Sequence, residues 1–254
     1  MTVLNHVSAG PDGDTAVVFL HSLGTDHRMW RDQAEALGTR HRVVLPDSRG
    51  HGGSAWTGPP AVGDWVADLD GVLDAAGVRR AVLVGLSLGG IQAIAYAAAH
   101  PGRVSALVVA DSFAALDPEV ATAKAEGLAG QALSEGTAAL ADTYVADTFT
   151  VSPLPPGAEV VRSAIAGMDA EAYAATARAC FGARVEDRLG AVRAPTLVLW
   201  GDRDRKTPRA LSERIAAGIE GAELAEVPGA GHLSNLENPA EFTRLVACFA
   251  DGRS

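Results

Sequence analysis

The 254-residue chain is poor in lysine and in positive charge generally. Lys124 and Lys206 are its two lysines, and 21 Lys plus Arg face 31 Asp plus Glu, which gives a net charge of −10. Proteins that bind nucleic acid present basic surfaces, and anionic membrane surfaces attract segments rich in Lys and Arg. We therefore expect neither nucleic acid nor a membrane surface to be a partner.

Cysteines and long apolar runs are also scarce. The two cysteines, Cys180 and Cys248, form neither a disulfide framework nor a metal-ligand spacing. The first residues show no basic segment followed by an apolar stretch, so no signal peptide is expected. The early apolar run at residues 16–20 is far shorter than the ~20 residues of a membrane helix. The sequence thus predicts a cytoplasmic protein without a metal centre.

What the chain does contain is an alternation of strand and helix patterns. Short apolar runs typical of strands buried in a parallel sheet occur at residues 16–20, 42–45, 81–84, 106–109, 196–200 and 224–227. Apolar residues with helical spacing lie at 29–37, 62–76, 88–99 and 242–249. This order predicts an α/β fold, a mostly parallel β-sheet flanked by helices.

The alternation stops between residues 113 and 189. This stretch is rich in alanine, lacks strand-like runs and contains one proline-rich loop at residues 153–156. We interpret it as an inserted helical cap over residues 113–189. The core then consists of residues 1–112 and 190–254.

A serine stands at the most informative position of the chain. Residues 85–89 read Gly-Leu-Ser-Leu-Gly, directly after the strand at 81–84 and directly before the helix at 88–99. A Gly-x-Ser-x-Gly motif in that context is typical of a nucleophile elbow, a sharp turn that exposes the serine hydroxyl. The helix then directs its free N–H groups and positive dipole end at the reacting centre. Ser87 is therefore the predicted catalytic nucleophile.

A serine nucleophile needs a base, and the base needs an acid. His232 follows the last strand pattern and is the predicted base. Asp204 follows the strand at 196–200 and is the preferred acid, because Ser, Asp, His is the chain order of one known triad class. Asp111 remains the alternative acid, whereas Asp202 is expected to bond the backbone of its own turn.

The negative charge that develops on the substrate needs hydrogen-bond donors. The backbone N–H of Leu88, next to the nucleophile, is one predicted donor. The loop at residues 21–24 should supply the other, and Leu23 is our choice. His21 at the start of this loop is expected to be structural and not a second base.

Five motifs in this order carry a family resemblance. Residues 21–26, 47–52, 85–90, 201–204 and 231–237 resemble α/β-hydrolases over nearly the whole chain, and most closely the 3-oxoadipate enol-lactonase group. The resemblance implies a serine hydrolase that cleaves a small ester or lactone through an acyl-enzyme, without a metal or organic cofactor. Alternatives on the same fold are a hydrolase of carbon–carbon bonds, an acyltransferase, or a ligand receptor with little turnover.

The cap departs from the resembling group. Members of that group often carry Arg-Trp before a Phe-Thr, whereas here Asp147 occupies the arginine's place. A guanidinium suited to a carboxylate is then missing, so we expect neutral esters or lactones to be preferred, with Arg178 as an alternative anchor. Bulky cap side chains are the predicted substrate contacts: Tyr144, Phe149 and Tyr173.

Overall fold

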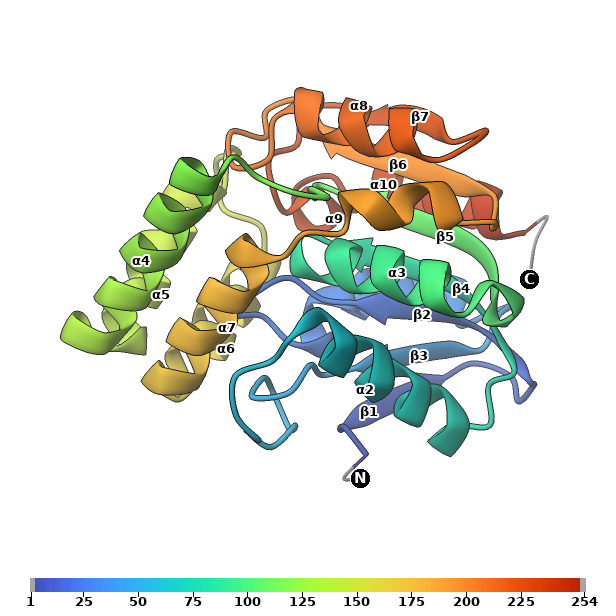
Figure 1. Ribbon diagram of the computed structural model, residues 1–254, viewed down its shortest axis with the longest axis horizontal. Coiled ribbons are helices and arrows are strands. Elements are labelled where there is room, and N and C mark those ends of the chain that lie inside the picture. Colours follow the sequence, from blue (N-terminus) through green and yellow to red (C-terminus); the bar gives the residue numbers. More distant parts are fainter. Residues whose placement is uncertain (1–2, 252–254) are drawn as a thin grey trace.

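Figure 1 shows the computed structural model, which describes residues 3–251. In these residues the chain forms one seven-stranded sheet with the order β1-β3-β2-β4-β5-β6-β7. Neighbouring strands are parallel except for the pair of β1 and β3. The strands are β1 (His6–Ala9), β2 (Thr15–Leu20), β3 (Val43–Pro46), β4 (Arg80–Leu86), β5 (Val104–Ala110), β6 (Thr196–Gly201) and β7 (Glu223–Val227).

The predicted α/β fold is confirmed, and the strands found from apolar runs lie where the sequence placed them. β4 and β5 occupy the middle of the sheet and are almost entirely buried, which explains their unbroken apolar character. β1 was not predicted. It is an edge strand that is mostly exposed, so burial leaves no apolar run in its sequence.

Helices cover the sheet between the strands. They are α1 (Arg31–Leu37), α2 (Val62–Ala75), α3 (Leu88–Ala99), α8 (Arg209–Gly218), α9 (Ser234–Glu237) and α10 (Pro239–Ala250), and short 3-10 turns are formed by His27–Trp30 and Pro101–Arg103. α2 and α3 lie side by side in front of the sheet in Figure 1. α1 packs against α10, where the Gln33 amide donates to the Thr243 hydroxyl. No helix in residues 3–251 is both long and apolar enough to cross a membrane.

Four helices separate β5 from β6 and stand at one end of the sheet in Figure 1. They are α4 (Pro118–Glu135), α5 (Thr137–Thr148), α6 (Gly157–Ala166) and α7 (Ala170–Gly182), followed by a 3-10 turn at Glu186–Ala191. α4 packs mainly against α7, and α5 against α6. We refer to these four helices as the cap. They stand over the loops that follow the carboxyl ends of β4, β5 and β6.

Candidate active site

Ser87 occupies the turn between β4 and α3. Its backbone has φ 56° and ψ −113°, a left-handed region that side chains other than glycine rarely adopt. A Cβ atom on Gly85 would collide with the Gly89 carbonyl, and one on Gly89 would collide with the Leu20 carbonyl. The two motif glycines are thus required by close packing. The strained turn presents the serine at the carboxyl ends of the parallel strands.

His232 joins Ser87 to Asp204. The Oγ atom of Ser87 lies 3.1 Å from Nε2 of His232, and Nδ1 of the same ring lies 3.0 Å from Oδ2 of Asp204. Because a carboxylate can only accept here, the imidazole carries its proton on Nδ1 and leaves Nε2 free to accept one from the serine. The structure therefore brings together the three side chains that the sequence proposed as a triad.

Thr207 holds the carboxylate of Asp204 in place. Its hydroxyl and its backbone N–H both donate to Asp204, as does the N–H of Lys206. Burial raises the pKa of Asp204, but the neighbouring His232 and the Thr207 donors outweigh it and lower the pKa below its ordinary value. The acid is thus kept ionised. Sequence reasoning missed Thr207, although Asp-x-x-Thr is a spacing that allows such a local bond.

The two competing aspartates are engaged elsewhere. Asp111 is fully buried, has φ 46°, and accepts hydrogen bonds from the Gly201 N–H and the Ser234 hydroxyl. Burial, together with the nearby Asp204 carboxylate, raises its pKa well above the ordinary value. Asp202 accepts from the backbone N–H of Ala230. The structure brings neither of them to His232.

Two backbone N–H groups near Ser87 have no acceptor among the described residues. They belong to Leu88, the first residue of α3, and to Leu23 in the loop after β2; both residues are buried. The next N–H along this loop, that of Gly24, donates to Nε2 of His51 at 3.1 Å. The loop is therefore fixed beside the serine with one donor left over, as an oxyanion site requires.

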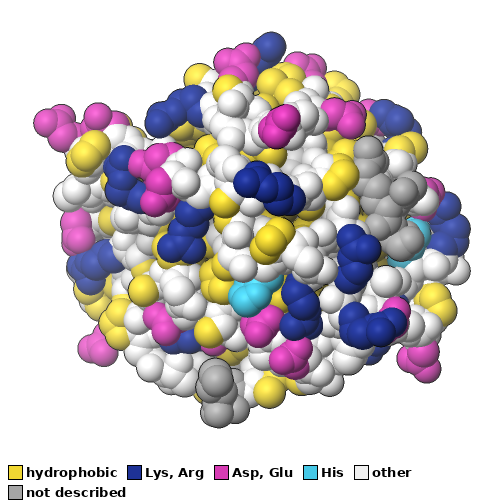
Figure 2. Space-filling model, turned by 45° about the vertical axis from the view of Figure 1, so that its right-hand side comes forward, with side chains coloured by type: hydrophobic (Ala, Val, Ile, Leu, Met, Phe, Trp, Pro, Cys, Tyr) yellow, Lys and Arg dark blue, Asp and Glu magenta, His cyan; other side chains and the backbone are white. Residues whose placement is uncertain are grey.

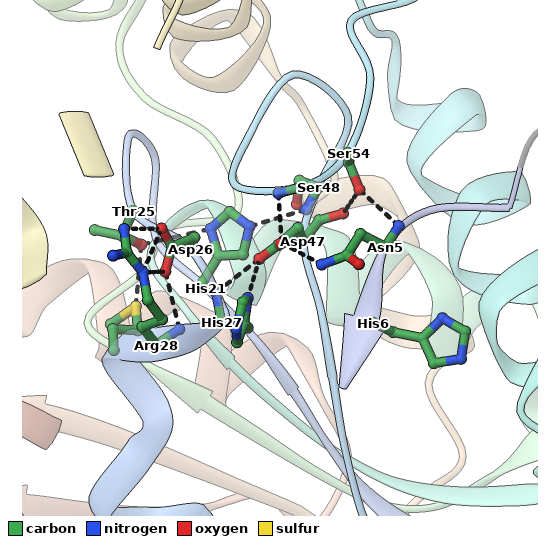
Figure 3. A network of polar contacts seen from close by, with 12 residues as sticks. Asn5, His6, His21, Thr25, Asp26, His27, Arg28, Asp47, Ser48 and Ser54 are labelled. Atoms are coloured by element: carbon green, nitrogen blue, oxygen red, sulfur yellow. Dashed lines mark hydrogen bonds and ion pairs between the residues drawn. The ribbon is translucent and has the colours of Figure 1, made fainter. Parts of the chain in front are cut away.

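A network of buried polar residues supports the loop after β2, and Figure 3 shows part of it. Nε2 of His21 accepts from the Ser48 N–H, so its Nδ1 carries the proton and donates to the Ser22 carbonyl. Burial lowers the pKa of His21, and burial with the nearby His21 lowers that of His51 to about 3. Both rings are thus neutral supports.

Asp47 is the centre of the network in Figure 3. Its carboxylate accepts from the Asn5 amide, from the Gly53 N–H, and from both the backbone and the ring of His27. Burial raises the pKa of Asp47, but these donors outweigh it and lower the pKa. Asp26, His27 and Asp47 bring possible metal-ligand atoms within 4.8 Å of one another. Protein donors already occupy these carboxylates, since Asp26 binds the Arg28 guanidinium.

Comparison with known proteins decides the family. Residues 17–245 match the model of the alpha/beta hydrolase family. The chain belongs to the α/β-hydrolases.

Relatives of this α/β-hydrolase include several named enzymes. 3-Oxoadipate enol-lactonase 1 of Acinetobacter baylyi is 32% identical over 241 residues, which cover 94% of this chain and 90% of that protein. A putative carbamate hydrolase, RutD, of Caulobacter sp. is 30% identical over 98% of this chain and 96% of its own. The crystal structure of the enol-lactonase from Burkholderia xenovorans LB400 superposes with a TM-score of 0.89 at 31% identity, covering 98% and 96% of the two chains.

The α/β-hydrolase core and its cap enclose a cavity of about 180 Å³ at Ser87. The core contributes Ser22, Leu23, Ser87, Phe113, Lys206, Thr207 and His232 to its lining, and the cap contributes Lys124, Leu128, Tyr144, Cys180 and Phe181. The ring of Phe181 stacks on that of Phe113, with centroids 6.1 Å apart. The lining is therefore mostly apolar around a few polar groups, which is typical of small-molecule sites.

Of the three cap side chains predicted to contact substrate, one lines this cavity and two lie elsewhere. Tyr144 lines the cavity, whereas Phe149 and Tyr173 do not. Phe149 follows the end of α5 and packs on the edge of the core. Tyr173 faces Gly24, where an added Cβ would lie 2.8 Å from its ring, so it supports the loop after β2. From α7 it is Cys180 and Phe181, about two turns further along, that reach the cavity.

Proposed function

We propose that this protein is a serine hydrolase that cleaves ester or lactone bonds through an acyl-enzyme on Ser87. One observation carries the proposal: a continuous line of hydrogen bonds runs from Asp204 through His232 to Ser87, beside two unused backbone donors. A serine hydroxyl becomes a nucleophile when a base in this position can take its proton. The enol-lactonase relatives named above support the same bond class.

In the first half-reaction, Nε2 of His232 takes the proton from Oγ of Ser87 as Oγ attacks the substrate carbonyl carbon. The carbonyl oxygen becomes an oxyanion, to which the N–H groups of Leu23 and Leu88 donate. Asp204 holds the imidazole in the required tautomer and stabilises its positive charge. The carbon–oxygen bond then breaks, and His232 returns the proton to the leaving alkoxide.

In the second half-reaction, a water molecule takes the place of the alcohol. His232 removes one of its protons as the oxygen attacks the acyl carbon, and the same N–H groups stabilise the second oxyanion. The bond to Ser87 breaks, and the serine recovers its proton from His232. A lactone differs in one respect, because its leaving hydroxyl is part of the acyl group, stays bound to Ser87 with it, and is released at deacylation within a single hydroxy acid.

Screening the purified protein against a panel of short esters and lactones tests the proposal, with Ser87→Ala as the matched control. We expect steady turnover by the wild type and its loss in the variant. A burst of one product equivalent followed by no further turnover would instead indicate a receptor. Hydrolysis that persists in Ser87→Ala would assign the reaction to another group and contradict the proposal.

Carbamate cleavage is a second candidate, supported by the relative named as a putative carbamate hydrolase. The same proton transfers serve it, with His232 protonating a leaving nitrogen instead of an oxygen. An ester and a carbamate of the same alcohol and of similar size separate the two possibilities by their kcat/KM values. Product analysis in ¹⁸O-labelled water distinguishes hydrolysis from acyl transfer, because hydrolysis puts the label into the released acid.

A further inference from the structure

Both lysines of the chain lie at the catalytic cavity. Lys206 comes from the loop after β6 and Lys124 from α4, so core and cap each supply one. The remaining basic residues of the chain are 19 arginines, and no described arginine lines the cavity. In a protein with a net charge of −10, positive charge at this one place is a specific feature of the site.

Many of the described arginines form ion pairs with carboxylates, whereas within residues 3–251 the two ammonium groups do not. Arg178, the alternative anchor considered from the sequence, forms an exposed ion pair with Glu126 at 2.7 Å. Figure 2 shows one face of the molecule, on which Lys and Arg side chains are interspersed with Asp and Glu side chains. Among residues 3–251, neither Lys124 nor Lys206 forms an ion pair; Nζ of Lys124 instead donates to the Lys206 carbonyl at 3.3 Å.

Lys206 lies where its ammonium group is partly removed from water. It is half-buried, and its Nζ lies 5.0 Å from the centre of the Tyr144 ring. Burial lowers its pKa, and the nearby charge of Lys124 lowers it further, while Asp147 and Asp204 raise it. The carboxylate of Asp204 is already bound by His232 and Thr207. An anion entering the cavity would satisfy both lysines at once.

We propose that Lys206 and Lys124 form an anion subsite that binds a carboxylate carried by the substrate. This inference rests on the proposed hydrolase function and specifies its substrate. It replaces the expectation of neutral substrates, which followed from the acid at position 147. The positive charge missing at that position is supplied from the loop after β6 and from α4.

The size of the cavity limits the substrate further. An engineered cavity of about 150 Å³ holds benzene, and ligand pockets commonly measure ~300–1,000 Å³. The 180 Å³ available here suits a compact molecule, such as a five- or six-membered lactone with one carboxylate. Phe113, Leu128 and Phe181 would contact its carbon skeleton, and the lysines its charge.

Two lactones of nearly equal shape test the subsite. One is 5-oxotetrahydrofuran-2-carboxylate, and the other is its primary amide, which lacks the charge. Turnover of each is measured for the wild type, Lys206→Met and Lys124→Met. Arg205→Met is the matched control, because it removes one positive charge next to Lys206 at an exposed position outside the cavity. Circular dichroism establishes that each variant is folded, and Lys206→Gln replaces Lys206→Met if that variant is not.

We expect the wild type to prefer the carboxylate by tenfold or more in kcat/KM. Lys206→Met should lower kcat/KM for the carboxylate roughly ten- to hundredfold, the worth of a charge-assisted hydrogen bond. It should lower the value for the amide by a much smaller factor, because the amide carries no charge and the backbone N–H of Lys206 still donates to Asp204. Lys124→Met should act in the same direction, and Arg205→Met on neither lactone. Equal loss for both lactones, or none, would overturn the subsite.

A binding measurement separates this inference from the proposed function. Calorimetric titration of the two lactones into Ser87→Ala and into Ser87→Ala with Lys206→Met requires no catalysis. Tighter binding of the carboxylate, lost with Lys206, would support the subsite even if the wild type hydrolysed nothing. Equal binding of both compounds in an enzyme that hydrolyses esters would overturn the subsite and leave the proposed function standing.

Discussion

On the core side of the cavity the polar groups of the proposed triad are hydrogen-bonded to one another, whereas on the cap side the lining offers few such bonds. Ser87, His232 and Asp204 form one connected line, and Thr207 holds its far end. The cap presents Leu128, Cys180 and Phe181, the Tyr144 ring, and one ammonium group. The core side is thus fixed by directional bonds, and the cap side by shape and charge.

This contrast separates the reaction from the choice of substrate. Directional bonds hold reacting atoms within the narrow tolerances that proton transfer requires. Apolar contacts and a flexible lysine stem accept different molecules with only modest changes in free energy. We therefore expect substitutions in the hydrogen-bonded line and at Thr207 to lower kcat, and substitutions of the cap lining or of the two lysines to change which substrate is preferred.

The largest effect is expected at Ser87. Ser87→Ala removes the nucleophile and should lower kcat by ~10⁴–10⁶. Because alanine fits the space of serine, thermal unfolding should change little. Steady-state turnover of the best ester of the panel measures the loss. Removing a triad member leaves a residual activity far below a tenth of the wild-type rate. A variant that keeps more than about a tenth of that rate would therefore contradict the assignment.

The two buried aspartates provide the next test. Asp204→Asn offers His232 a donor in place of an acceptor and favours the wrong tautomer, with an expected loss of ~10⁴ in kcat as in the serine-protease example. Asp111→Asn is the matched control, since an amide can accept from Gly201 and donate to Ser234. It should keep kcat within about tenfold. A greater loss in Asp111→Asn than in Asp204→Asn would indicate that Asp111, which follows β5, is the acid.

A smaller effect is expected at Thr207. Thr207→Val removes the hydroxyl donor and leaves the two backbone donors to Asp204, so kcat/KM should fall by roughly tenfold. That hydroxyl helps to lower the pKa of Asp204. Its loss raises this pKa, and activity should then decline at a higher pH as the solution is acidified. An unchanged acid limb in the pH profile would show that the hydroxyl does not stabilise the ionised acid.

The smallest effect on the reaction is expected in the cap at Phe181. Phe181→Ala enlarges the cavity and removes the stack on Phe113. KM for a short ester should rise by about three- to tenfold, while kcat stays within about twofold. Esters with longer acyl chains should lose less or gain. If kcat instead fell as far as in Thr207→Val, the proposed division between core and cap would not hold.

The sequence allowed the grouping of the core side chains to be inferred, but not the side chains that the cap directs into the cavity. Ser87, Asp204 and His232 follow β4, β6 and β7, and the carboxyl ends of parallel strands lie at one edge of a sheet, so their proximity could be inferred from strand order alone. Their catalytic roles stay predictions. Thr207 was missed because its role depends on the fold of a single loop.

In the cap, burial alone does not reveal which side of a helix meets the substrate. Tyr173 and Phe181 belong to the same helix, yet one packs beneath the loop after β2 and the other lines the cavity. The lysines entered the sequence analysis only through net charge, because their separation of 82 residues gives no hint that they meet. Such contacts depend on how the cap helices pack on the core, and local sequence patterns do not specify that packing.

The cap begins and ends on two strands that are bonded to each other. The N–H of Leu107 in β5 donates to the Pro195 carbonyl, and the N–H of Asp111 donates to the Leu199 carbonyl in β6. The two ends of the segment that forms the cap are therefore held together at the sheet, whatever the length of that segment. Loop-closure entropy rises by only ~0.6 kcal/mol for each doubling of length. A core of this kind can exchange one cap for another of different size, and acquire a new substrate, without rebuilding the strands that carry the proposed nucleophile, Ser87.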